Sequence, residues 1–151
     1  LKHVQEISCP VYYTALEPHP LPMNLISKID FKLKKEDHKI FKISHDINWE
    51  ELIQLSSNFY LNKMKTTLQD FKNKKTFQII YFDAFGPRVE HNLWNIDVFS
   101  KIHALLDDGG IFVTYCAKGQ VRRDLQSVGF EVERLPGPPG KREMLRGIKK
   151  K

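Results

Sequence analysis

The stretch FQIIYFDAFGP, residues 77–87, decides the fold of this chain. Its first six residues form a nearly continuous apolar run, which is typical of a fully buried strand in a parallel sheet. Asp83 follows this run directly, and Gly86-Pro87 breaks the pattern. Ligands of open parallel sheets bind outside the carboxyl ends of the strands, so Asp83 is a candidate site residue from its place alone. A loop cap is the alternative role for this carboxylate.

Helix and strand patterns alternate downstream of that stretch. Segments with apolar side chains at three- and four-residue spacing, typical of helices, alternate with segments of alternating or consecutive apolar residues, typical of strands. Glycines separate these segments. The predicted elements are a helix over 93–106 ended by Gly109-Gly110, a strand over 111–115, a helix over 121–128 stopped by Gly129, and an antiparallel strand pair over 130–135 and 143–148.

Upstream, Pro10 and Pro18 enclose a predicted short buried strand, Val11–Leu16, which ends at Glu17. Residues 21–57 predict an α-rich insertion with a helix over Trp49–Leu55, and 59–67 predict a strand near a sheet edge. The whole order predicts one α/β domain over residues 1–151, with a mostly parallel sheet and an antiparallel pair at its C-terminal end. A carboxylate placed like that of Glu17 suits the two hydroxyls of a ribose, or it simply keeps a turn solvated.

The net charge of +6 is unevenly distributed. Residues 1–117 hold 14 basic and 14 acidic side chains, whereas 118–151 hold 10 basic and 4 acidic ones. An excess of this kind indicates either a solvated surface or a patch for a polyanion such as RNA. The candidates for such a patch are Lys118, Arg122, Arg123, Lys141, Arg142 and Arg146.

Composition excludes several classes of protein. Cys9 and Cys116 are far apart, and the six histidines lack metal-ligand spacing, so we expect neither a disulfide framework nor a metal site. No apolar run is long enough to span a membrane, and no secretory signal begins the chain. We therefore expect a cytoplasmic protein.

Two longer stretches carry a family resemblance: YFDAFGPRVEHNLWNIDVF, residues 81–99, and LDDGGIFVTYCAKGQVRRDLQSVGFEVERLPGPPGKREMLRG, residues 106–147. They contain an Asp-Gly/Ala-Phe-x-Pro segment, a Leu-Trp pair, a Val-Arg-Arg helix and a Lys-Arg-Glu-Met segment in this order. The chain thereby resembles the methyltransferase module of the tRNA 5-methylaminomethyl-2-thiouridine biosynthesis family. The resemblance is strong over 77–148 and moderate over 11–20.

This resemblance implies a Rossmann-like class I methyltransferase fold with S-adenosyl-L-methionine as cofactor. It implies methyl transfer to the primary amine of 5-aminomethyl-2-thiouridine at the tRNA wobble position. It assigns cofactor binding to Glu17, Asp83, Ala84 and Phe85, with Asp83 beside the reacting amine as base or positioning group. It assigns substrate contact to Phe85, Gly86 and Pro87. The residues that would contact tRNA phosphates are Lys118, Arg122, Arg123, Lys141 and Arg142. Some relatives are fused to a flavin-dependent oxidase that makes the amine, so such an oxidase is an expected separate partner.

One departure from the family concerns the glycine-rich cofactor loop, which should precede Glu17. All eight glycines stand at or after Gly86, so the first strand and its loop are missing from this sequence. We expect the native chain to extend upstream of Leu1 with a strand, a glycine-rich turn and a helix.

Alternative functions remain at this level. One is a class I methyltransferase of a protein or small-molecule amine, and another is a non-catalytic RNA-binding remnant. A nicotinamide dehydrogenase is the weakest, since no Gly-x-Gly-x-x-Gly follows a strand. Phe85 and Trp94 either stack on a base or pack in the core, and we expect packing for Trp94.

Overall fold

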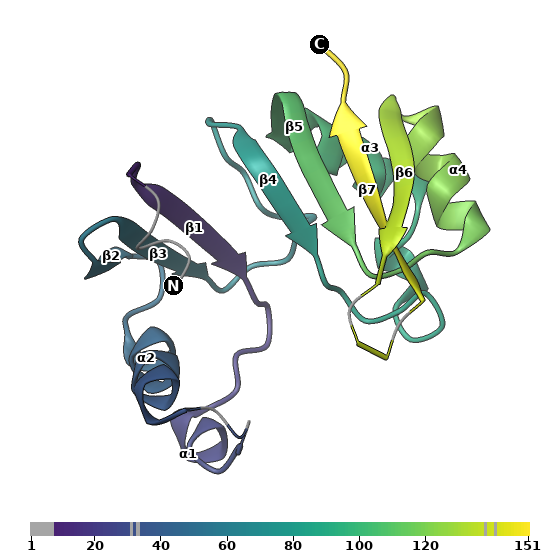
Figure 1. Ribbon diagram of the computed structural model, residues 1–151. Coiled ribbons are helices and arrows are strands. Elements are labelled where there is room, and N and C mark those ends of the chain that lie inside the picture. Colours follow the sequence, from purple (N-terminus) through teal and green to yellow (C-terminus); the bar gives the residue numbers. More distant parts are fainter. Residues whose placement is uncertain (1–7, 31, 33, 138, 141) are drawn as a thin grey trace. The chain divides into compact units, whose positions relative to one another are not determined.

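The computed structural model describes residues 8–30, 32, 34–137, 139–140 and 142–151. The chain divides into two compact units, Leu1–Phe71 and Lys72–Lys151, and each unit has a sheet of its own (Figure 1).

The sheet of the first unit has the strand order β1-β3-β2. β1 (Val11–Leu16) runs parallel to β3 (Phe59–Met64), and β2 (Leu52–Ser56) is antiparallel to β3. The predicted bounds of β1 are confirmed. β3 starts as predicted but lies at the centre of this sheet, so the expected edge position is wrong. β1 is also less buried than predicted, because Tyr12 and Tyr13 are exposed.

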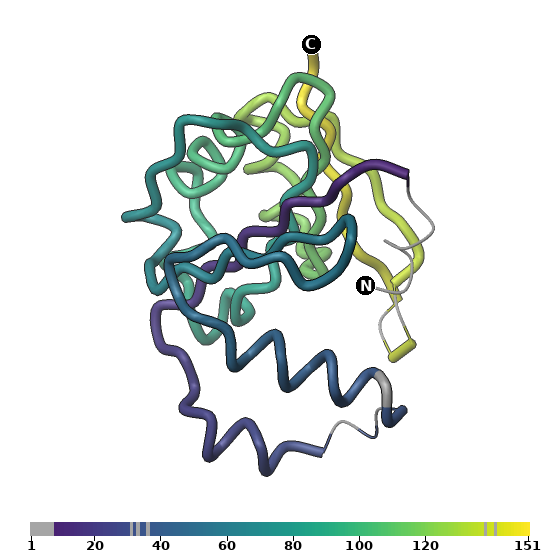
Figure 2. The backbone as a smooth tube through the Cα atoms, turned by 90° about the vertical axis from the view of Figure 1, so that its left-hand side faces the viewer, coloured from purple at the N-terminus to yellow at the C-terminus, as the bar shows by residue number. Residues whose placement is uncertain are grey.

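The predicted insertion contains two helices, α1 (Met23–Ile26) and α2 (Lys35–Asp46), which lie next to each other in Figure 2. The helix predicted over Trp49–Leu55 is wrong, since residues 52–56 form β2 instead. Pairing with β3 overrides the local pattern there. The buried Lys63 of β3 donates to the His45 carbonyl at 2.6 Å and lies 4.7 Å from the Trp49 ring.

The sheet of the second unit has the order β4-β5-β7-β6. Its strands are β4 (Phe77–Phe82), β5 (Leu106–Thr114), β6 (Phe130–Pro136) and β7 (Glu143–Lys149). β4 and β5 are parallel, whereas β7 is antiparallel to both β5 and β6. The place and parallel direction of β4 and the antiparallel pair β6–β7 are thereby confirmed. β4 is an edge strand of this sheet, however, and exposes Ile79 and Tyr81, so its predicted full burial is wrong.

Two helices pack against this sheet and against each other, α3 (Ile96–Leu105) and α4 (Gly119–Ser127), and the short helix η2 (His91–Leu93) precedes them (Figure 1). The Asn95 side chain caps α3 by accepting from the Val98 amide at 3.0 Å. Gly129 has φ +103° and stands just past α4, which confirms its predicted role as the stop.

The predicted role of Gly109-Gly110 as a helix stop is wrong. α3 already ends at Leu105, and β5 starts at Leu106 and runs through both glycines. Between the pairs Phe77–Leu106 and Ile79–Ile111 the register shifts, because β5 contains extra residues there. The glycines make this bulge feasible, since Gly109 has φ +79° and a Cβ on Gly110 would lie 2.7 Å from a backbone oxygen. Asp107 within the bulge accepts hydrogen bonds from the side chains of Thr76 and Gln78.

The core of the second unit lies between the sheet and these helices. Phe99 and Ile102 of α3, Phe112 of β5, Leu125 of α4 and Leu145 of β7 are all fully buried. Aromatic rings continue this core toward the carboxyl end of β4, where Phe82 contacts Trp94 with ring centroids 5.0 Å apart. The carboxyl ends of β4 and β5 therefore rest on a rigid base.

Candidate active site

The loop that follows β4 starts at Asp83 and is held in place by two side chains. The Tyr115 hydroxyl donates to the Ala84 carbonyl at 2.6 Å, and the Trp94 indole nitrogen donates to the Phe85 carbonyl at 2.7 Å. Farther on, the Gly86 carbonyl accepts from the amides of Val89 at 2.8 Å and Glu90 at 3.1 Å. Side-chain contacts thus fix the backbone on either side of Phe85, while the Phe85 ring itself is 71% exposed.

Tyr115 links the loop after β4 to the segment after β5. Burial raises the pKa of Tyr115, and the charges of Cys116 and Asp83 act in the same direction. The hydroxyl therefore stays protonated at neutral pH and remains a hydrogen-bond donor. The effect of Asp83 shows that its exposed carboxylate lies within electrostatic range of this ring.

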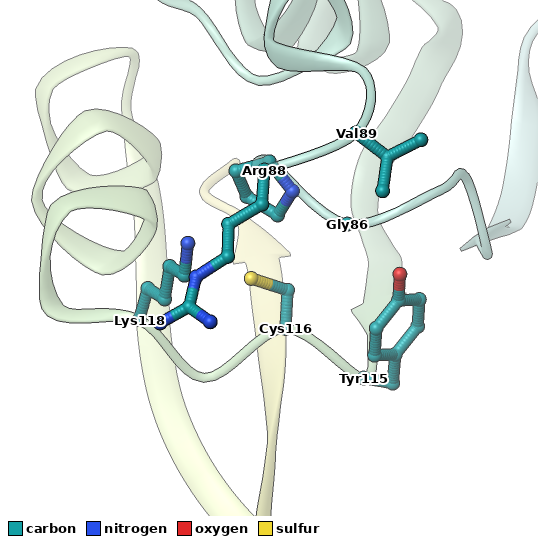
Figure 3. Close-up of a pocket in the computed structure, with 7 residues that line it drawn as sticks. Gly86, Arg88, Val89, Tyr115, Cys116 and Lys118 are labelled. Carbon is teal, nitrogen blue, oxygen red and sulfur yellow. The ribbon is translucent and has the colours of Figure 1, made fainter.

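A pocket of about 310 Å³ opens beside this link (Figure 3). Arg88 and Val89 come from the loop after β4, whereas Tyr115, Cys116 and Lys118 follow β5. The side chains of Arg88 and Lys118 extend into the same part of the pocket, and the buried Cys116 thiol lies at its wall. The two segments that end the parallel strands thus form one concave surface, as expected for an α/β sheet.

Glu17 lies where the sequence predicts, directly after β1 in the first unit. Its backbone amide donates to the Met64 carbonyl at 3.0 Å, and its Oε1 accepts from the His19 amide at 2.8 Å. The carboxylate is exposed, so it can accept further hydrogen bonds. Glu17 belongs to the first unit and Asp83 to the second.

The predicted RNA-contacting residues have different surroundings. Lys118 is the N-cap residue of α4 and lines the pocket. Arg123 is exposed and donates to the Gln120 side chain at 2.7 Å, whereas Arg122 is half-buried, with its Nε buried and without a hydrogen bond. Arg142 is exposed, and Lys141 lies outside the described residues.

Part of the basic excess of residues 118–151 is neutralised by ion pairs across the β6–β7 pair. Arg146 contacts Glu133 at 2.8 Å, and Arg134 contacts Glu143 at 3.0 Å. The hydrogen bond from Arg146 lowers the pKa of Glu133. These two ion pairs therefore offset part of the positive charge of the strand pair.

Sequence reasoning missed Arg88 and Tyr115 as site residues. Arg88 stands one residue after Gly86-Pro87, and that adjacency to a strand-end breaker is a signal that points to it. Tyr115 reads as the end of a buried strand, and only the contact with Ala84 reveals its role. The expected packing of Trp94 is confirmed, since 8% of it is exposed.

Two kinds of feature are absent from the described part of the chain. No three His, Cys, Asp or Glu side chains gather there in a way that suits a metal ion. No helix in those same ranges has the length and apolar character that a membrane span needs. Cys9 and Cys116 are both free thiols.

Comparison with known proteins identifies several similar sequences. A family described as S-adenosyl-L-methionine-dependent methyltransferase matches residues 28–150. The tRNA 5-methylaminomethyl-2-thiouridine biosynthesis bifunctional protein MnmC of Pseudoalteromonas atlantica is 41% identical over 68 residues, or 45% of this chain and 10% of that protein. Its counterpart from Burkholderia multivorans is 40% identical over 67 residues, or 44% and 10% of the two chains. These matches span about a tenth of the length of the curated relatives.

A solved structure extends the comparison to nearly the whole chain. The crystal structure of MNMC2 from Aquifex aeolicus superposes with a TM-score of 0.74 and 21% sequence identity. The superposition covers 97% of this chain and 47% of that one. At this identity the likeness establishes the fold, which confirms the predicted Rossmann-like α/β class.

Proposed function

The chain belongs to the S-adenosyl-L-methionine-dependent methyltransferase family, and from this premise we propose that it methylates the primary amine of 5-aminomethyl-2-thiouridine at the tRNA wobble position. The product of that reaction is 5-methylaminomethyl-2-thiouridine, the modified nucleoside after which the MnmC relatives are named. Those relatives are called bifunctional. We therefore propose that a flavin-dependent oxidase, which makes the substrate amine, is a partner of this protein. We also propose that the protein acts in the cytoplasm, where tRNA is modified.

The observation that carries the proposal is the placement of Asp83 at the carboxyl end of β4. The next two residues have their carbonyls held by Tyr115 and Trp94, so the backbone beside the carboxylate is fixed before any substrate binds. A positioned carboxylate is what an amine substrate requires, since an alkyl amine is mostly a cation at neutral pH. Fixed geometry matters because methyl transfer is an in-line displacement.

The cofactor assignment rests on Glu17 in the first unit and on Asp83, Ala84 and Phe85 in the second. The Glu17 carboxylate fits a ribose, because it is exposed and only Oε1 is occupied by a backbone amide. S-adenosyl-L-methionine, when bound, supplies a methyl group attached to a positively charged sulfur. Exposed Phe85 offers an aromatic face for the substrate base, beside Gly86 and Pro87.

In the proposed mechanism Asp83 binds the substrate ammonium and accepts its proton. With that proton removed, Asp83 would hold the neutral nitrogen for transfer of the methyl group that S-adenosyl-L-methionine would supply, and the sulfur would keep the electron pair of the bond that breaks. Lys118, Arg122, Arg123, Lys141 and Arg142 bind tRNA phosphates in this proposal. Arg122 is half-buried, whereas Lys118, Arg123 and Arg142 are exposed. These three side chains are therefore more accessible to a phosphate than Arg122 is.

The test replaces Asp83 with asparagine in the full-length protein. Asparagine keeps the size and one acceptor but loses the charge, so Asp83→Asn should retain the fold, and its loss of cofactor affinity should be small beside its loss of turnover. Methyl transfer to tRNA should fall by about a hundredfold or more, and higher pH should restore part of the rate as the amine loses its proton unaided. Asp97→Asn removes the same charge from the exposed first turn of α3 and is the matched control.

Normal turnover by the Asp83→Asn variant would contradict the catalytic role of this residue. Unfolding as its only defect would return Asp83 to the role of a loop cap. Methylation of a protein or free amine but not of tRNA would favour the alternative substrate class. RNA binding without any methyl transfer by the unaltered protein would favour the non-catalytic alternative.

A further inference from the structure

Arg88, which has no role in the proposed function, and Lys118, which there binds an unspecified tRNA phosphate, form a pair of cations. They come from two different loops, yet both line the pocket beside Tyr115 (Figure 3). Within the described ranges neither has an ion-pair partner, although Glu90 stands two residues from Arg88 in the chain. Two cations that line one pocket attract an anion to it.

The backbone around both side chains is restrained. Arg88 lies inside the turn closed by the Gly86 carbonyl, which accepts from the Val89 and Glu90 amides. Lys118 precedes α4, and its carbonyl accepts from the Arg122 amide at 3.1 Å. The cations are thus presented by fixed loops, which reduces the ordering cost of binding a ligand.

The composition of the pocket indicates which anion it suits. An arginine fork pairs with two oxygens of a phosphate at once, and a lysine adds a point charge. The rest of the lining is largely apolar, with Pro87, Val89 and the Tyr115 ring, and its volume of about 310 Å³ exceeds the needs of a lone ion. Apolar walls beside two cations match a phosphodiester together with the sugar or base attached to it.

We propose that Arg88 and Lys118 bind one phosphodiester of the RNA next to the nucleotide that is methylated. The inference rests on the proposed function, because it takes the substrate to be RNA with its reactive amine at Asp83. Tyr115 connects the two places directly, since it lines the pocket and also holds the Ala84 carbonyl. A phosphate bound here therefore positions the adjacent nucleotide relative to Asp83.

The experiment measures binding of a short labelled single-stranded RNA to the full-length protein over a series of salt concentrations. Each phosphate neutralised in single-stranded RNA contributes about 0.7 to the slope of log affinity against log salt. The double variant Arg88→Gln with Lys118→Gln should lose about that much slope and weaken binding about tenfold at low salt. Arg88→Lys keeps the charge and should retain the slope while losing part of the affinity.

The matched control is Lys74→Gln with Lys75→Gln, which removes two exposed charges from the residues before β4. These lysines precede the strand, whereas the pocket follows it, so about 20 Å of extended chain separates the two places. The control should change slope and affinity less than the pocket variant. Equal effects of the two double variants, or no effect of either, would overturn the subsite.

Two further measurements distinguish a failure of the proposed subsite from a failure of the proposed function. Inorganic phosphate that binds the unaltered protein tightly and is not displaced by RNA would overturn the assignment to RNA. Methyl transfer to tRNA is measured on the same preparations. If the unaltered protein methylates no tRNA, the proposed function fails, while a loss of salt slope confined to the pocket variant still supports the phosphodiester subsite.

Discussion

Replacing Tyr115 with phenylalanine removes one oxygen atom and tests how the loop at Asp83 is held. The hydroxyl donates to the Ala84 carbonyl at 2.6 Å in a partly buried setting. A hydrogen bond of this kind contributes about 1 kcal/mol to the free energy of unfolding, which is roughly a fivefold change in the equilibrium. The aromatic contact with Trp94, at 6.3 Å between ring centroids, is retained by phenylalanine.

The expected result for Tyr115→Phe is a small loss of stability and a larger relative loss of function. For a unit of the size of Lys72–Lys151, about 1 kcal/mol corresponds to a drop in Tm of about 4–8 °C, measured by circular dichroism. Because Ala84 follows Asp83, the freed carbonyl should let the carboxylate move, so kcat should fall about fivefold or more. Trp94→Phe, which frees the next carbonyl, provides a comparison within the same loop.

The pH dependence of stability provides an independent arm of this test. Burial raises the pKa of Tyr115 in the folded state above its ordinary value of about 10. The stabilisation by the protonated hydroxyl is therefore complete below about pH 10 and is lost as the pH rises through the raised folded pKa. The stability advantage of the unaltered protein over Tyr115→Phe should vanish in that alkaline range. Equal Tm and equal kcat at neutral pH for the two proteins would refute the role of Tyr115.

Two further predictions concern stability. Leu125→Ala, at a fully buried position of α4, should cost about 2–5 kcal/mol in urea denaturation, whereas Ala in place of the exposed Gln126 should cost little, and equal losses would contradict this packing. Hydrogen bonds lower the folded-state pKa values of Asp107 and Glu133, so the stability they contribute is present above about pH 4.5 and is lost as the pH falls through the lowered values. Glu133→Gln should flatten the acid side of the stability profile, and an unchanged profile would show that the Arg146 pair contributes nothing.

The elements that local sequence determines are those with strong periodicity and clear end signals. The bounds of β1 and β4 follow from prolines and from a continuous apolar run, and α4 ends before Gly129 because only glycine readily adopts the positive φ required there. The antiparallel pairing of β6 and β7 follows from the short turn between them. The positions of Asp83 and Glu17 at strand ends follow for the same reason, since a strand end is readable from one segment.

The elements that sequence reasoning assigned wrongly are those settled by contacts between distant segments. Residues 52–56 form a strand because β3 supplies hydrogen-bond partners, although their local pattern favours a helix. Gly109-Gly110 lies within a strand because the register of β5 against β4 shifts at that point. The local sequence of each segment does not indicate which strand it will pair with. Pairing with a distant strand therefore overrides the local secondary-structure propensity.

The same distinction between local sequence and contacts among distant segments applies to the candidate site. The sequence by itself determined the family, the acidic residue after the buried strand and the excess of positive charge toward the C-terminal end. Only the tertiary structure brought Arg88 to Lys118 and the Tyr115 hydroxyl to the Ala84 carbonyl. The physical reason is that parallel neighbours β4 and β5 place their carboxyl ends side by side, so residues some thirty positions apart in the chain meet at one edge of the sheet.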